Sequence, residues 1–84
     1  MFEVRLLKQP RKYLQKVPEK VRRGFYTCFE KLEKDPYRIA EPLYGLLRGK
    51  WKVRTGDFRL ILDINPEIRR IKVIYIGPRG DIYK

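Results

Sequence analysis

The C-terminal half of this chain reads as three strand-like runs that two short turns separate, and the first run alternates apolar and polar residues. The runs are 50–54, 58–64 and 71–76, and the turns are Thr55-Gly56-Asp57 and Asn65-Pro66-Glu67. A period of two is typical of strands that bury one face. Because turns this short join neighbouring antiparallel strands, we expect a three-stranded antiparallel meander.

The N-terminal half contains one strand pattern followed by two helical patterns. Phe2, Val4 and Leu6 alternate with charged residues, which predicts a strand that Pro10 closes. A short helix is expected over residues 11–17, and Pro18 suits the first position of a second helix, which Asp35-Pro36 ends. This second helix carries an apolar stripe at spacings of three and four, formed by Val21, Phe25, Cys28, Phe29 and Leu32.

These patterns predict an α+β fold with the element order βααβββ. The 84 residues leave room for one small domain, which we expect to span residues 1–84. We expect an antiparallel sheet with the helical hairpin packed on one face and the opposite face partly open. Residues 37–49 connect the second helix to the meander, and Leu43, Leu46 and Leu47 are expected to pin this connector to the core.

The composition favours some functions and excludes others. With 21 Lys and Arg against 10 Asp and Glu, the net charge of +11 favours a polyanionic partner, and nucleic acid is the first candidate. The chain has no His and no Ser, so neither a Ser-His-Asp triad nor a Cys-His pair can be assembled. One Cys and scattered acids supply no convincing ligand set, so we expect no metal and no cofactor.

The apolar runs and the single cysteine indicate where in the cell the chain is expected. No apolar run is longer than 73–76 and no hydrophobic stretch follows Met1, so we expect neither a membrane span nor a secretory signal. Cys28 has no second Cys to pair with, which fits a reducing cytoplasm. We interpret Cys28 as a small core residue, and Trp51 likewise as core, because each stands on an apolar face.

A row of cations lies on the face of the meander that the core does not use. Lys50, Lys52 and Arg54 share this face because side chains at i, i+2 and i+4 of a strand point the same way. One interpretation is a solvated outer face whose charges discourage aggregation. The other is a phosphodiester site, because Arg59 lies across the hairpin and Arg79 and Tyr83 follow the last strand.

Two segments resemble the RelE/ParE toxin superfamily, "LYGLLRGKWKVRTGDFRLILDI" and "IRRIKVIYIGPRGDIY". That family has a Leu-x-Gly leading to Arg-x-Arg-x-Gly-Asp-Tyr-Arg, an apolar strand, and a closing Gly-His-Arg…Tyr. By this resemblance Lys52 and Arg54 match the two basic strand positions, Arg59 the arginine after Gly-Asp-aromatic, Arg79 the arginine after the last strand, and Tyr83 the C-terminal tyrosine.

Two positions depart from the family pattern. Phe58 replaces the usual Tyr but keeps an aromatic body, whereas Pro78 replaces His and fixes the backbone just before Arg79. The resemblance covers nearly the whole chain and also fits the βααβββ order. It implies the toxin of a toxin-antitoxin pair, and in the RelE branch a ribosome-dependent endoribonuclease that cleaves messenger RNA. It also implies a cognate antitoxin, which should be acidic to meet the positive charge.

RNA chemistry suggests roles for these residues. The ribose 2′-OH can attack the adjacent phosphate without metal if one group removes a proton and another supplies one. Tyr83 and Lys52 are both candidates for the base. Arg54 and Arg59 would hold the phosphate, while Arg79 would stabilise the leaving oxygen. Further cations are expected to grip RNA or ribosomal phosphates, or to form the wet side of the helices and strand, namely Lys50, Arg48, Arg11, Lys12, Lys16, Arg22 and Arg23.

Two other functions remain open at this stage. One is a ParE-like, non-hydrolytic poison of DNA gyrase, which shares the scaffold. That branch typically lacks the full basic and tyrosine set, so the retention of these residues argues against it. The other is a basic RNA-binding domain without catalysis, for which Tyr83 would be dispensable.

Overall fold

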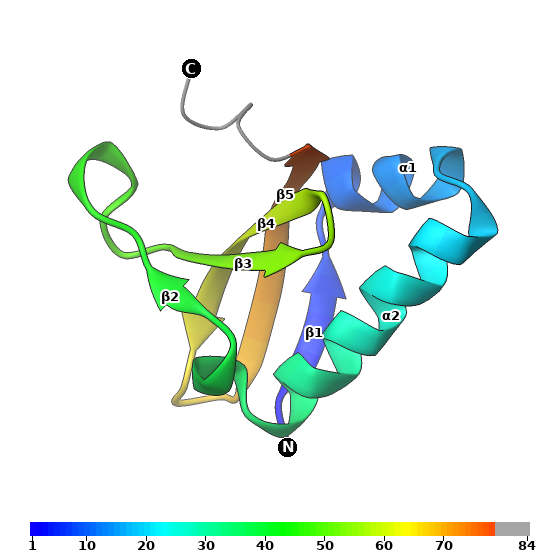
Figure 1. The fold of residues 1–84 in the computed structure, drawn as a ribbon. Helices are drawn as coiled ribbons and strands as arrows, with labels where there is room; N and C mark the ends of the chain where they lie inside the picture. Colours follow the sequence, from blue (N-terminus) through cyan, green and yellow to red (C-terminus); the bar gives the residue numbers. More distant parts are fainter. Residues whose placement is uncertain (79–84) are drawn as a thin grey trace.

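The computed structural model describes residues 1–78, in which two helices cover one face of a five-stranded sheet (Figure 1). The strands are β1 (Glu3–Leu6), β2 (Glu41–Pro42), β3 (Trp51–Thr55), β4 (Phe58–Asn65) and β5 (Arg70–Pro78). The helices are α1 (Lys8–Lys16) and α2 (Glu19–Lys34), and two short 3₁₀ turns are η1 (Pro36–Arg38) and η2 (Gly45–Leu47). The strand order across the sheet is β1-β5-β4-β3-β2.

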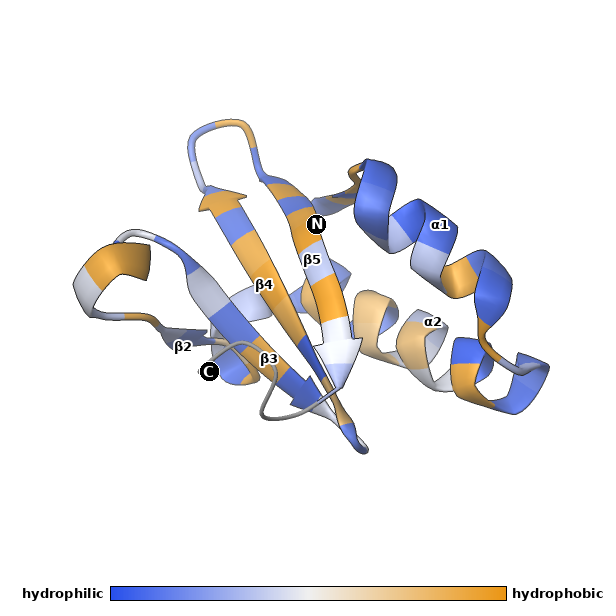
Figure 2. Ribbon diagram, turned by 90° about the horizontal axis from the view of Figure 1, so that it is seen from above, coloured by the Kyte–Doolittle hydropathy of each residue, from blue (hydrophilic) through white to orange (hydrophobic). Residues whose placement is uncertain are grey.

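The expected meander is confirmed, because β3, β4 and β5 pair antiparallel in sequence order. Thr55 lies opposite Phe58, so the hairpin loop consists of Gly56 and Asp57 alone. Gly56 has a φ of 58°, a value that the first position of a two-residue hairpin loop commonly needs and that glycine adopts without steric cost. Polar and apolar residues alternate along β3, whereas β4 has an apolar middle (Figure 2).

The α+β fold with its helical hairpin on one face is confirmed, but the sheet is mixed and not wholly antiparallel. β1 pairs parallel with β5, with Val4 opposite Ile71. A hairpin turn forces the next strand to run antiparallel, whereas two helices separate β1 from the meander and leave its direction open. The contact that sets it joins residues almost seventy positions apart, which local patterns do not reveal.

Helix α1 begins earlier than expected, at Lys8, and includes Pro10 in its first turn. Proline is tolerated there because the first backbone N–H groups of a helix have no partner within the helix. Gln9 then ties α1 to β5: its side-chain amide donates to the Ile76 carbonyl at 2.8 Å and accepts from the Ile76 N–H at 2.9 Å. Neither helix in residues 1–78 has the length and apolar character needed to cross a membrane.

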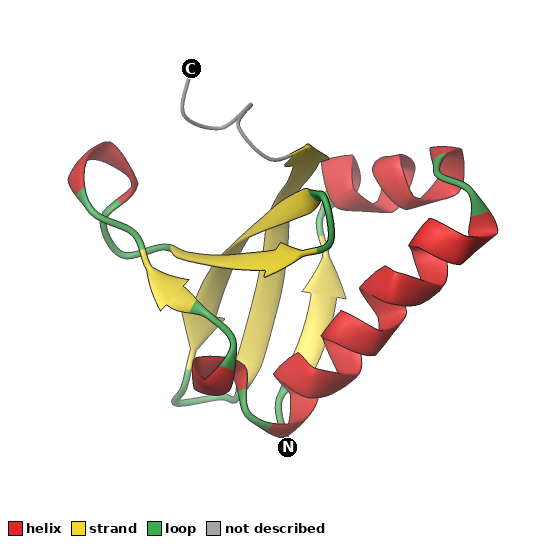
Figure 3. Cartoon of the chain, in the orientation of Figure 1, coloured by secondary structure: helices red, strands yellow, loops and turns green. Residues whose placement is uncertain are grey.

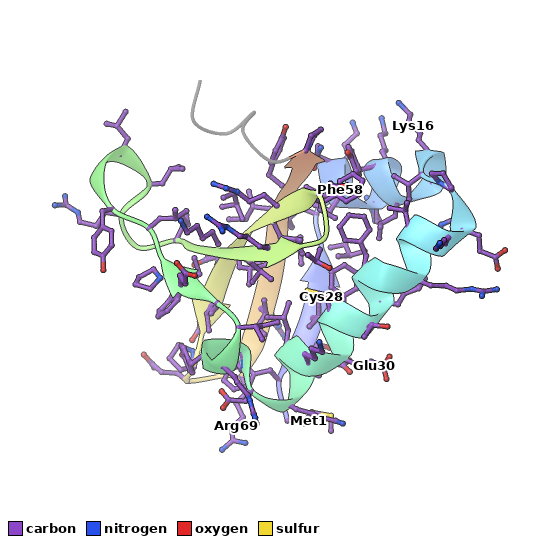
Figure 4. All side chains as sticks on the ribbon, in the orientation of Figure 1. Met1, Lys16, Cys28, Glu30, Phe58 and Arg69 are labelled. Atoms are coloured by element: carbon purple, nitrogen blue, oxygen red, sulfur yellow. The ribbon has the colours of Figure 1, made fainter. Side chains whose placement is uncertain are left out.

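One hydrophobic core lies between the helices and the sheet. Its buried members are Leu14, Phe25, Cys28, Phe29, Leu32, Ala40, Val53, Leu60, Leu62, Ile71, Val73 and Ile76. Figure 4 places Cys28 between α2 and the sheet, as expected for a small core residue. Trp51 packs against this core from β3 and also contacts Tyr37, with ring centroids 5.3 Å apart. Phe58 packs tilted against Phe25 with centroids 5.2 Å apart, so its aromatic body serves the core.

The connector between α2 and β3 is only partly pinned. Leu43 is buried, but Leu46 and Leu47 are exposed, so that part of the expectation is wrong. These two leucines are in η2, in a loop that projects from the sheet beyond β2 (Figure 3). Gly45 and Gly49 bend the chain there with φ values of 71° and 95°, and the loop carries its leucines away from the core.

Candidate functional site

The face of the sheet that the helices leave uncovered, called here the open face, carries the predicted basic residues. Val53, Leu60 and Ile76 point to the core, so their strand neighbours point to the open face. The pairing registers arrange these neighbours in two rows that run across the sheet. The lysine row consists of Glu41, Lys52, Ile61 and Tyr75, and the arginine row consists of Arg54, Arg59 and Gly77.

The arginine row holds two arginines on neighbouring strands. Arg54 and Arg59 are directly opposite each other, a pairing that puts Cβ atoms about 5 Å apart. Arg54 is exposed, whereas Arg59 is only 6% exposed and is the one charged residue among residues 1–78 that is buried. Like charges in this position destabilise a sheet. They are, however, well placed to bind a phosphate together, because each guanidinium offers several donors to its oxygens.

The lysine row is less strongly positive. Lys52 lies 4.0 Å from the Glu41 carboxylate of β2, and its side chain is only 21% exposed. Lys50, just before β3, lies 3.8 Å from Asp63. Ile61 occupies the middle of the row at 5% exposure, although it is not part of the core cluster. The open face is therefore a partly covered surface and not a fully solvated one, which strengthens the charge interactions on it.

Two of the predicted catalytic residues, Arg79 and Tyr83, lie outside the described residues. The last described residue of β5, Pro78, is opposite Phe58, one position beyond the arginine row. Arg48, at the end of η2 in the projecting loop, is exposed and is a member of neither row. The open face thus brings together Lys52, Arg54 and Arg59 of the predicted catalytic set.

The helical cations divide into two groups. Lys12 and Lys16 lie on one side of α1 with Lys8, and together with Gln9 and Tyr13 they line a surface hollow of about 410 Å³. Figure 4 shows Lys16 pointing away from the protein. Arg11 is also exposed. These side chains are accessible to a phosphate backbone.

The two predicted cations on α2 already have protein partners. The Arg22 guanidinium donates to the carbonyl oxygens of Leu14 at 2.8 Å and Val17 at 3.0 Å. It therefore satisfies carbonyl groups at the C-terminal end of α1, which helices otherwise leave without partners. Arg23 forms a surface ion pair with Glu19 at 3.0 Å. Arg22 is a structural residue in this fold, a role that its charge alone did not reveal.

Sequence reasoning also missed Tyr75. The pairing of β4 and β5 shifts between Ile61 and Leu62, because Ile61 is opposite Tyr75 whereas Leu62 is opposite Val73. This β-bulge gives β5 one extra residue, Ile74, and reverses which positions face the core. A signal was present, since core residues occur at the odd positions 71 and 73 and then at the even position 76. Such a break in alternation indicates a bulge.

The chain is similar to known proteins in both sequence and fold. No protein-family profile matches the chain. A Mycobacterium tuberculosis protein named toxin RelG is 29% identical over 84 residues, which cover 99% of this chain and 97% of that protein. Toxin RelE of the same organism is 32% identical over 72 residues, 84% of this chain and 74% of that protein. The crystal structure of the toxin-antitoxin complex RelBE2 from M. tuberculosis matches with a TM-score of 0.85 and 26% identity, over 93% of this chain and 98% of that one.

Proposed function

Because this chain belongs to the RelE family of toxins, we propose that it is an endoribonuclease that cleaves messenger RNA on the ribosome. The observation that carries the proposal is the arginine row, in which Arg54 and Arg59 lie opposite each other on an open sheet face. Two arginines on neighbouring strands suit a phosphodiester, whose negative charge grows in the transition state. Lys52 lies one row away and adds a third cation.

The proposed reaction needs no group beyond the side chains of the chain and the RNA itself. The 2′-oxygen attacks the adjacent phosphorus and loses its proton to a base, for which Tyr83 and Lys52 are the candidates. The bond from phosphorus to the 5′-oxygen breaks, and that oxygen receives a proton that Arg79 helps to deliver. The products are a 2′,3′-cyclic phosphate and a free 5′-hydroxyl. Arg54 and Arg59 hold the phosphate, and Arg79 stabilises the leaving oxygen.

An acidic antitoxin is the proposed protein partner. The net charge of +11 favours a partner of opposite charge, and the similar structure RelBE2 is a toxin-antitoxin complex. Co-expression with a neighbouring acidic protein should yield a complex that purifies together. Free expression of the chain alone in growing cells, at no cost to growth, would contradict the toxin role.

The proposed activity is tested in a defined translation reaction in which the messenger is mapped by primer extension. Cuts in phase with codons, present only when ribosomes are added, are the expected result. The variant pair Arg54→Met and Arg38→Met provides a matched control, because Arg38 is exposed in η1 and is a member of neither row of the open face. Arg54→Met should lose most cleavage and Arg38→Met should lose none. An intact messenger would refute the nuclease, and DNA breaks beside an intact messenger would point to a gyrase poison.

A further inference from the structure

Tyr75 leans out of its own row and covers the empty position at Gly77. A Cβ atom built on Gly77 would lie 2.6 Å from the Tyr75 hydroxyl oxygen and 2.7 Å from its Cε2 atom. Gly77 is in the arginine row, directly opposite Arg59. The phenol hydroxyl therefore takes the place of a missing side chain in that row, beside the position of Arg59 and with Arg54 on the strand beyond it.

The backbone does not explain why residue 77 is glycine. Gly45, Gly49 and Gly56 have positive φ angles, but Gly77 does not. A glycine inside a strand weakens it, and it commonly marks a place where something must approach the backbone closely. Here the approaching group is the Tyr75 ring, because any Cβ would collide with it. The glycine is thus explained by the position of the tyrosine.

Two further features support a role for this tyrosine beyond packing. The bulge at Ile74 turns Tyr75 to the open face, and bulges often re-aim side chains beside active sites. Tyr75 is also only half-buried, and among residues 1–78 its hydroxyl has no hydrogen-bond partner. A phenol O–H that is not fully buried, at the end of the row that contains Arg59 and Arg54, is a ready donor to an anion.

The geometry points to Tyr75 as a further substrate-contacting residue, whose hydroxyl donates a hydrogen bond to the RNA phosphate held by Arg54 and Arg59. This inference rests on the proposed function for its ligand, an RNA phosphodiester. It raises the number of side chains that donate to the phosphate from two to three. Gly77 is the positioning residue that leaves room for the phenol.

The inference is tested by binding of a single-stranded RNA oligonucleotide that is 2′-O-methylated throughout, so that 2′-oxygen attack is blocked. Fluorescence anisotropy gives its affinity for wild type, Tyr75→Phe, Gly77→Ala and the double variant at several salt concentrations. Tyr75→Phe should weaken binding about tenfold, a typical loss for one hydrogen bond to a charged group. Gly77→Ala should do the same by displacing the ring, and the double variant should lose no more than either alone.

Two controls separate this role from a structural one. Tyr44→Phe removes the same atom from a side chain that is 81% exposed, and it should bind like wild type. Because a phenol is neutral, Tyr75→Phe should leave the salt dependence unchanged, whereas Arg54→Met should reduce its slope by about one unit. Circular dichroism establishes that each variant is folded. If Gly77→Ala does not fold, Tyr75→Phe still tests the inference, because it keeps the aromatic ring and removes only the hydroxyl.

Each outcome decides the question. Wild-type affinity in Tyr75→Phe would overturn the inference, and so would equal loss from Tyr44→Phe or a full hundredfold loss in the double variant. Failure of wild type to bind the oligonucleotide would overturn it as well. If wild type binds and Tyr75→Phe weakens binding but no messenger is cut on ribosomes, the proposed nuclease fails while Tyr75 stands as a phosphate contact.

Discussion

The core face and the open face of the meander are built from residues of the same three strands, yet they differ in burial and in charge. Val53, Leu60 and Ile76 on the core face are at most 1% exposed and pack against the helices. On the open face, Arg54 and Arg59 hold like charges opposite each other. The first arrangement stabilises the fold and the second destabilises it.

The arginine pair therefore depends on contacts elsewhere in the fold for its stability. A chain of 84 residues has a small margin of stability, so a repulsive pair persists only if other contacts offset it. Phe58 illustrates the link, because it lies on β4 next to Arg59 and packs between Tyr13 and Phe25 of the two helices. The helices thereby hold the hairpin that presents the arginines. Changes on the two faces should therefore fail in different ways.

The largest expected effect is on the stability of the core face. Phe25 is 1% exposed and contacts Phe58, so Phe25→Ala should lower the free energy of unfolding by about 3–5 kcal/mol. Urea denaturation measures this loss. The neighbouring Tyr26→Ala is the matched control, because Tyr26 is 50% exposed and should cost much less. A loss below 1 kcal/mol in Phe25→Ala would contradict the assigned core.

The next effect is a pH dependence that belongs to the core face alone. Burial raises the pKa of the Cys28 thiol from 9.0 to about 11, only partly opposed by the charge of Lys31. The folded chain therefore holds this proton where the unfolded chain loses it. The resulting stability is complete below pH 9 and is lost as the pH rises through about 11, amounting to about 3 kcal/mol at most.

Cys28→Ala isolates this dependence, because lysine and tyrosine titrations are common to both chains. The free energy of unfolding, measured from pH 7 to pH 11, should fall more steeply in wild type than in Cys28→Ala above pH 9. Parallel curves would show that the thiol is not desolvated in the core. In either chain, ribosome binding at neutral pH should be unaffected.

A smaller effect sharpens the distinction among the cations. Lys12→Met on α1 should reduce the salt dependence of ribosome binding by about one unit of slope and leave stability within about 0.5 kcal/mol. Arg22→Met should do the reverse, keeping the slope and losing about 1–3 kcal/mol of stability, because two carbonyl groups lose their donor. If the two variants changed the salt dependence and the stability equally, the division into phosphate-binding and structural cations would be wrong.

Local patterns predicted the parts of the fold that local forces determine. The two helices, the antiparallel meander and the buried stripe of α2 follow from periodicity and turn residues, and all are present. The parallel pairing of β1 was missed, because it depends on a contact between distant residues. The exposure of Leu46 was missed because an apolar residue reads as buried unless the path of its loop is known.

The candidate site was likewise predicted only where local patterns determine it. Lys52, Arg54 and Arg59 share one face because strand alternation and a two-residue hairpin fix their positions. The partners of Arg22 and the position of Tyr75 were not foreseen. The first depends on how one helix end meets its neighbour, and the second on a bulge whose mark in the sequence is a single break in alternation.

The most direct test of the open face as an active site is single-turnover cleavage of messenger by Arg59→Met on saturated ribosomes, with the free energy of unfolding measured alongside. Methionine keeps much of the buried aliphatic stem and removes the charge. Cleavage should fall about a hundredfold or more, as is typical when a transition-state donor is lost, while the chain remains folded. A folded Arg59→Met that cleaves at the wild-type rate would contradict the role of the open face as an active site.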